Sequence, residues 1–89
     1  MATYKIKPQA LLQEVGDETV ILNLDSGEYF TLDSVGTRMI RLFQEEPDPE
    51  AVAAKITEEY DVAFDQAYSD LNNLLEEMRE HGLATRDEV

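Results

Sequence analysis

The chain has 89 residues, which is enough for one small hydrophobic core and too short for a second domain. Twenty acidic residues against seven basic ones give a formal net charge of −13, which would repel the phosphates of a nucleic acid and an anionic membrane surface alike. There is no cysteine, no apolar run near Met1 that could act as a signal peptide, and no stretch close to the roughly 20 apolar residues of a membrane span, so we expect a soluble, cytoplasmic protein without disulfides or thiolate metal sites.

Three short strands are predicted in the first half of the chain, over residues 11–15, 18–24 and 28–32. They are joined by tight turns that contain Gly16 and Gly27, because glycine tolerates the positive φ that such turns require. Strands connected in this way form an antiparallel meander. The second strand then lies in the centre of the sheet and the third lies at an edge.

Alternation of side chains divides these strands between two faces of the sheet. In the second strand one face carries three apolar residues: Val20, Leu22 and Leu24. In the third strand, Phe30 and Leu32 point one way and are assigned to the core. Tyr29 and Thr31 point the other way, and for these two the pattern is compatible with either a buried or a ligand-binding position.

Three helices are predicted in the second half. The first begins at Asp33-Ser34, both good N-caps, and runs to about Gln44. The second begins at Asp48-Pro49, where an N-cap acid precedes a first-turn proline, and the third covers residues 65–81. The third is expected to end at Gly82, with Leu83 folding back on the helix. Each has an apolar stripe with helical spacing. These stripes are Val35, Met39, Ile40 and Phe43; Val52, Ala53, Ile56 and Tyr60; and Ala67, Leu71, Leu74, Leu75 and Met78.

This order of elements predicts an α+β fold in which a three-stranded antiparallel sheet is followed by three helices, like a winged helix-turn-helix. Residues 11–84 form the expected domain, with residues 1–10 as an N-terminal extension and residues 85–89 as a C-terminal tail.

Side chains typical of catalysis do not occur in a usable arrangement. His81 is the only histidine and lies in the last turn of a predicted helix, where a cation is favoured by the helix dipole. Adjacent acids such as Glu58-Glu59 and Glu76-Glu77 point about 100° apart on a helix, as expected for solvated charge. There is neither a calcium-loop spacing nor a glycine-rich phosphate loop. We therefore expect no enzyme activity, no cofactor and no metal site.

The third strand offers a place for binding instead. Proteins usually protect an edge strand with charged residues, bulges or proline, and the segment from Tyr29 to Leu32 has none of these. An extended peptide could therefore add itself as a further strand. The wide apolar arc of the third helix, with adjacent Leu74 and Leu75, could form one wall of a groove beside that strand, although most of the arc is expected to be core.

The residues from Val20 to Asp33 resemble the signature of the PqqD-like family: a hydrophobic strand, a Ser-Gly turn and paired aromatics. Further segments match the family in order: Val35–Ile40, Asp48–Ala53, Glu59–Val62, Asp70–Leu75 and Gly82–Leu83. The resemblance covers residues 11–84. The chain departs from the family at Ala63-Phe64, where a polar cap and proline are common, and at Met39-Ile40, where a tryptophan is common.

Members of this family are recognition elements for ribosomally made, post-translationally modified peptides (RiPPs). The resemblance implies that the leader segment of a precursor binds as an added strand in a groove bordered by the third helix. Carried over by position, the implied leader-binding residues are Glu28, Tyr29, Phe30, Thr31 and Leu32 on the strand and Asp70, Leu71, Leu74, Leu75 and Met78 on the helix. The sequence does not indicate which flank of the helix faces the peptide.

Within the family, the chain is most similar to stand-alone lasso-peptide leader-binding proteins, which deliver the precursor to a leader peptidase or other maturation enzyme. Two alternatives stay open. One is the member of the quinone-cofactor pathway that presents its precursor to a radical-SAM enzyme. The other is an acidic winged-helix regulator that works through protein contacts.

Overall fold

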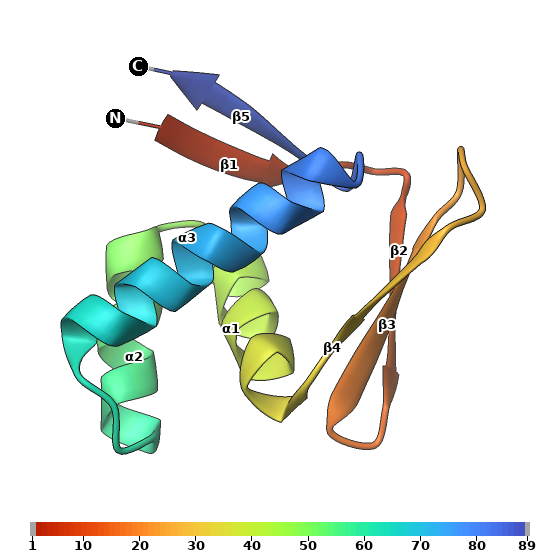
Figure 1. The fold of residues 1–89 in the computed structure, drawn as a ribbon. Coiled ribbons are helices and arrows are strands. Elements are labelled where there is room, and N and C mark those ends of the chain that lie inside the picture. The colour runs from red at the N-terminus through yellow and green to blue at the C-terminus, as the bar shows by residue number, and fades with distance from the viewer. Residues whose placement is uncertain (1, 89) are drawn as a thin grey trace.

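The computed structural model describes residues 2–88 and combines two small antiparallel sheets with helices (Figure 1). The larger sheet has the strand order β2-β3-β4, and the smaller sheet pairs β1 with β5. The strands are β1 (Ala2–Ile6), β2 (Ala10–Val15), β3 (Glu18–Asn23), β4 (Tyr29–Leu32) and β5 (Ala84–Glu88). The helices are α1 (Ser34–Glu45), α2 (Pro49–Glu59) and α3 (Phe64–Glu80). The predicted α+β class, meander and helices are confirmed, but the chain forms a second sheet that was not predicted.

The meander has the predicted connectivity. Its two turns place Gly16 at φ 68° and Gly27 at φ 77°, in the region that glycine enters without steric cost. β3 lies between its neighbours, so β2 and β4 are both edge strands. The helices cover one face of this sheet, and the central buried side chain on that face is Ile21.

The buried face of β3 is not the one with the larger number of apolar residues. Thr19, Ile21 and Asn23 face the core, whereas Val20 and Leu22 lie on the outer face and Leu24 lies beyond the strand, 58% exposed. The polar side chains are tolerated because they are hydrogen-bonded. The Thr19 hydroxyl donates to the hydroxyl of Thr37 (2.9 Å).

Asn23 links the meander to the end of α3. Its Nδ2 donates to the carbonyl oxygen of His81 (3.0 Å), and its Oδ1 accepts from the backbone N–H groups of Asp25 (2.9 Å) and Ser26 (3.2 Å). A side chain with three such bonds gains more from burial than an unpaired amide would, and it also fixes the turn that leads into β4.

The helix boundaries follow the predicted capping signals. Oδ1 of Asp33 accepts from the N–H of Gly36 (2.8 Å) at the start of α1, and Oδ1 of Asp48 accepts from the N–H of Glu50 (3.1 Å) at the start of α2. α3 begins after Ala63, which supplies no side-chain hydrogen bond. This is the position where the sequence departs from the family pattern.

The end of α3 is a Schellman stop, as predicted. Gly82 has φ 73°, the Leu83 N–H donates to the carbonyl of Met78 (2.8 Å), and the Gly82 N–H donates to the carbonyl of Arg79 (3.0 Å). Leu83 is buried, so the stop turns the chain back into the core. None of the helices within residues 2–88 has the length and apolar character needed to cross a membrane.

The terminal strands were not predicted. β1 pairs antiparallel with β5, with Tyr4 opposite Arg86, and the pair lies beside the end of α3 (Figure 1). The Lys7 N–H donates to the carbonyl of Leu83 (2.9 Å), and Tyr4 and Ala84 join the buried core. Segments expected to be an extension and a tail therefore support α3 from one side.

Candidate functional site

The outer edge of β4 has backbone groups that point away from the sheet. The Asn23 N–H donates to the Glu28 carbonyl (2.9 Å), so these residues form a hydrogen-bonded pair. Bonded and non-bonded pairs alternate along antiparallel strands, and Phe30 pairs with Ile21 in this register. The N–H and C=O groups of Phe30 therefore face β3, whereas those of Tyr29 and Thr31 face outward. Within residues 2–88 no backbone hydrogen bond occupies these outward groups.

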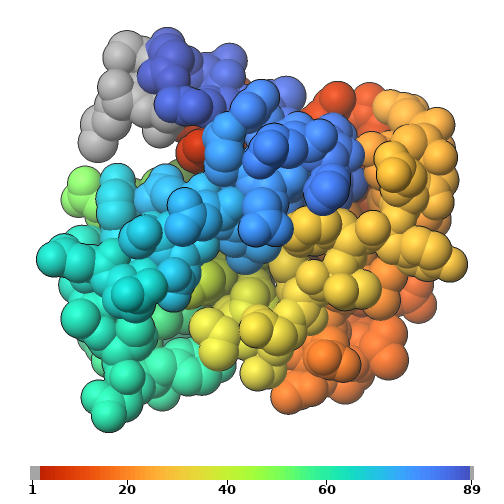
Figure 2. All heavy atoms as spheres, viewed as in Figure 1, coloured from red at the N-terminus to blue at the C-terminus, as the bar shows by residue number. Residues whose placement is uncertain are grey.

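A groove of about 680 Å³ lies beside this edge, between β4, the first turns of α1 and one flank of α3. Its floor includes Leu32 and Met39, which are almost fully buried, and Leu74 contributes from α3. Figure 2 shows α3, in blue, lying alongside the yellow surface of β4 and the start of α1. An open strand edge and an apolar groove are therefore adjacent.

The structure brings five of the ten predicted site residues to this groove: Phe30, Thr31, Leu32, Asp70 and Leu74. Glu28 and Tyr29 are exposed next to it, with Tyr29 at 76% exposure on the outer face of the sheet. The placement answers the question of which flank of α3 faces β4, because Asp70 and Leu74 lie on that flank.

Three predicted residues lie elsewhere and require a correction. Leu71, Leu75 and Met78 have no exposed surface and form part of the central core. Their position follows from helical phase: together with Ala67 they repeat at three- and four-residue intervals and point inward. They support the groove from below and do not line it.

Sequence reasoning missed six lining residues: Glu18, Asp33, Val35, Gly36, Met39 and Glu77. Glu77 could have been found, because it lies three positions after Leu74 and so shares its helix face. The α1 residues could have been inferred from the direct connection of β4 to that helix. Glu18 reaches the groove only through the pairing of β3 with β4, which one strand by itself does not reveal.

Comparison with known proteins identifies the family of the chain. Residues 18–84 match the family model described as coenzyme PQQ synthesis protein D (PqqD). The chain belongs to the PqqD family. No curated protein matches the sequence.

Two solved structures have the same fold as this PqqD-family chain. One is TbiB1 in complex with the TbiA(beta) leader peptide, with 34% identity and a TM-score of 0.83, covering 90% of this chain and 93% of that one. The other is a lasso peptide synthetase B1 complexed with the leader peptide, with 25% identity and a TM-score of 0.84, covering 93% and 98% of the two chains. The PqqD-family chain is thus similar in fold and sequence to proteins solved with leader peptides.

His81 connects the groove region of the PqqD-family domain to its core. Its ring lies 5.1 Å from the ring of Phe30, tilted by 54°, while its carbonyl accepts from Asn23. These contacts hold the end of α3 against β4. They give the only histidine a structural role that does not depend on catalysis.

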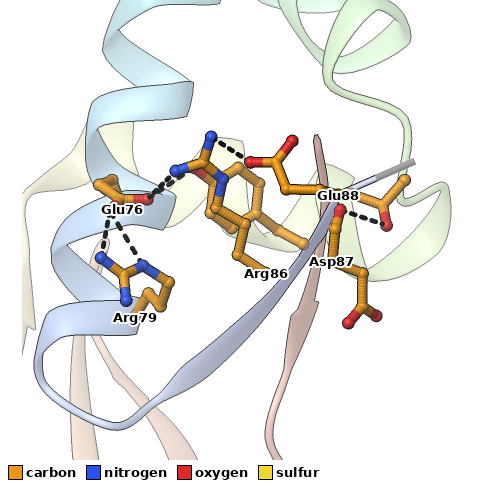
Figure 3. A network of polar contacts seen from close by, with 7 residues as sticks. Glu76, Arg79, Arg86, Asp87 and Glu88 are labelled. Carbon is orange, nitrogen blue, oxygen red and sulfur yellow. Dashed lines mark hydrogen bonds and ion pairs between the residues drawn. The ribbon is translucent and has the colours of Figure 1, made fainter. Parts of the chain in front are cut away.

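The opposite flank of α3 is occupied by a polar network (Figure 3). Oε2 of Glu76 accepts from the Tyr4 hydroxyl (2.7 Å), and Oε1 accepts from Nε of Arg79 (2.9 Å). Arg86 of β5 lies 3.8 Å from the same carboxylate and pairs with Glu88 at 2.6 Å. The hydrogen bond from Arg79, reinforced by that from Tyr4, lowers the pKa of Glu76 to about 2, from an ordinary value of 4.5.

The same contact affects Tyr4. Burial and the hydrogen bond to Glu76 raise the pKa of its hydroxyl. Within the described chain no group of three or more His, Cys, Asp or Glu side chains is arranged to hold a metal ion. The groove beside β4 is the candidate site for the PqqD-family chain, because it adjoins the open strand edge.

Proposed function

We propose that this chain is a non-catalytic RiPP recognition element that binds the leader segment of a precursor peptide as a strand added to β4. The observation that carries the proposal is the open outer edge of β4 next to an apolar groove. The fold and sequence similarity to two proteins solved with leader peptides supports it.

The backbone of β4 supplies one part of the binding. The N–H and C=O groups of Tyr29 and Thr31 offer two donors and two acceptors to a peptide strand. Such bonds depend on the peptide backbone and not on its side chains, so they supply affinity with little sequence selectivity. Selectivity must come from the groove.

The groove supplies the second part. Alternate side chains of an added strand would point toward the helices and pack against Phe30, Leu32 and Leu74. A micromolar complex needs about 8 kcal/mol of net binding free energy. Burial of two apolar anchors, each worth roughly 1.5–3 kcal/mol, supplies a large share of this, and the strand hydrogen bonds offset part of the cost of ordering the peptide.

The proposal also includes the pathway in which the leader is bound, the location in the cell and the residues that form the binding unit. The adaptor delivers a lasso-peptide precursor to a leader peptidase or another maturation enzyme, in the cytoplasm where the precursor is made. The leader-binding unit comprises residues 11–84, arranged like a winged helix and supported by the β1–β5 pair. Similarity to a lasso peptide synthetase B1 complexed with the leader peptide favours this pathway.

A second candidate is a PqqD-type protein that presents its precursor to a radical-SAM enzyme in pyrroloquinoline quinone biosynthesis. It is favoured by the description of the matching family model. Both candidates use the same groove, so the precursor that binds distinguishes them. Fluorescence polarisation with labelled TbiA(beta) leader, with a PQQ precursor peptide, and with short peptides encoded beside the gene for this chain provides the comparison.

Substitution of Thr31 by proline tests the added-strand mode. Thr31→Pro removes an outward-facing N–H from β4, and we expect the leader dissociation constant to rise at least tenfold, equivalent to about 1.4 kcal/mol. Glu14→Pro is the matched control, because the Glu14 N–H faces outward from β2 at the other edge of the same sheet. Unchanged binding by a folded Thr31→Pro protein, as judged by circular dichroism, would contradict strand addition.

A further inference from the structure

We infer that the segment recognised by the groove carries Lys or Arg side chains flanking its apolar anchor. This inference rests on the proposed function, because it describes the ligand of the same groove. It concerns the charge of the groove lining. Strand addition and apolar packing alone would not select for the charge of the peptide.

Four carboxylate side chains line the groove around its apolar floor: Glu18, Asp33, Asp70 and Glu77. Two come from α3, one from the start of β3 and one from the cap of α1. No Lys or Arg of the described chain is among the lining residues. A peptide strand in this groove therefore passes between acidic side chains that have no basic neighbour within the lining.

The basic residues are placed elsewhere. Each of the four arginines is ion-paired outside the groove: Arg38 with Glu59, Arg41 with Glu14, Arg79 with Glu76, and Arg86 with Glu76 and Glu88. The three lysines line other hollows of the surface: Lys5, Lys7 and Lys55. None of these side chains neutralises the groove.

The distance between the acids on α3 lies between the two side-chain repeat distances of an extended strand. Asp70, Leu74 and Glu77 share one helix face, and seven residues separate the two acids, which is about 10.5 Å along the axis. Side chains on one face of a strand repeat every 6.6 Å or so, and the next interval is about 13 Å. A basic–apolar–basic pattern at alternate positions therefore places its apolar residue near Leu74 and brings its flexible basic side chains within reach of both acids.

These acids are also available to a ligand. The carboxylate of Glu77 makes no hydrogen bond or ion pair to another residue of the described range. Asp70 accepts one hydrogen bond from Nε2 of Gln66 (2.7 Å), which leaves its second oxygen for a further donor. Both side chains are intact acceptors for a lysine or arginine of the peptide.

The net charge of −13 would attract any basic peptide, so the test must separate the groove from the overall field. Asp70→Asn with Glu77→Gln removes two charges at the groove. Glu46→Gln with Glu58→Gln removes two charges from exposed positions that do not line it. The two double variants have the same net charge and differ only in where the charge is lost.

The experiment selects a display library of random peptides on the full chain at an ionic strength of about 0.15 M. Only peptides that lose binding to Thr31→Pro are retained, which restricts the set to ligands of the β4 edge. We expect Lys and Arg to be enriched at alternate positions around an apolar residue. The groove double variant should bind these peptides about threefold to tenfold more weakly, whereas the control variant should bind them like the wild type.

Three results would overturn the inference, and they can be told apart. Edge-dependent binders without an excess of basic residues would remove the charge preference and leave the proposed function intact. An equal loss of binding in both double variants would assign the preference to the overall field. A library with no edge-dependent binder would count against the proposed function itself.

Discussion

The two flanks of α3 show how one helix can be closed on one side and open on the other. On the closed flank, Glu76 is bonded to Tyr4 and Arg79 and lies near Arg86 of β5 (Figure 3). On the open flank, Leu74 and the two acids beside it face the groove next to β4. β5 has the sequence ATRDE, and β4 has the uncharged sequence YFTL. Arg86 of β5 pairs with the helix on the closed flank, whereas β4 has no charged side chain that could pair with α3 on the open flank.

The largest expected effect is a loss of folding stability when a side chain on the core side of α3 is shortened. Leu75→Ala should lower the free energy of unfolding by about 2–5 kcal/mol, because the side chain is fully buried and its loss leaves a cavity. Urea denaturation followed by circular dichroism measures this change. A loss below 1 kcal/mol, at the scale of surface substitutions, would show that Leu75 is not part of a packed core.

Substitution of the neighbouring residue, Leu74, should affect leader binding more than folding stability. Leu74→Ala removes a half-buried side chain of the open flank, so the free energy of unfolding should fall by less than about 1.5 kcal/mol. Leader binding should weaken about tenfold, equivalent to 1.4 kcal/mol, because an apolar contact of the groove is lost. Titration by fluorescence polarisation tests this. A folded Leu74→Ala variant that binds like the wild type would remove this flank from the site.

The smallest expected effect concerns the closed flank and depends on pH. The folded-state pKa of Glu76, about 2, lies below its ordinary value of 4.5, so ionised Glu76 stabilises the fold above pH 4.5 and this contribution is lost as the pH falls toward 2. Glu76→Gln should lower Tm slightly at neutral pH, since exposed ion pairs are weak, and the gap to the wild type should close through this window. Leader affinity should not change. A gap that stays constant from pH 7 to pH 2 would exclude this linkage.

Local signals were sufficient to predict the elements that depend on neighbouring residues. The two glycine turns, the caps at Asp33 and Asp48, and the stop at Gly82 each involve residues a few positions apart, and each appears in the structure as predicted. The edge position of β4 followed from the meander, because tight turns leave few possible strand orders.

Features that depend on distant contacts were missed or misassigned. β1 and β5 pair across almost the whole chain. β1 alternates Ala2, Tyr4 and Ile6 with polar residues, a pattern that was overlooked, whereas the ATRDE sequence of β5 has no apolar alternation that would mark it as a strand. In β3, the buried positions of Thr19 and Asn23 depend on partners in α1 and at the end of α3, so the apolar content of the strand does not by itself identify the buried face. In α3, adjacent Leu74 and Leu75 point about 100° apart, and which of the two is buried depends on where the other elements pack against the helix.

The shortness of β4 has a practical consequence. The strand has four residues, and only Tyr29 and Thr31 turn their backbone groups outward, so in the proposed mode the strand hydrogen bonds hold only a short segment of the peptide. Residues that follow this segment do not contact the β4 edge. We therefore expect that the same short segment, fused ahead of an unrelated protein, would bring that protein to this chain.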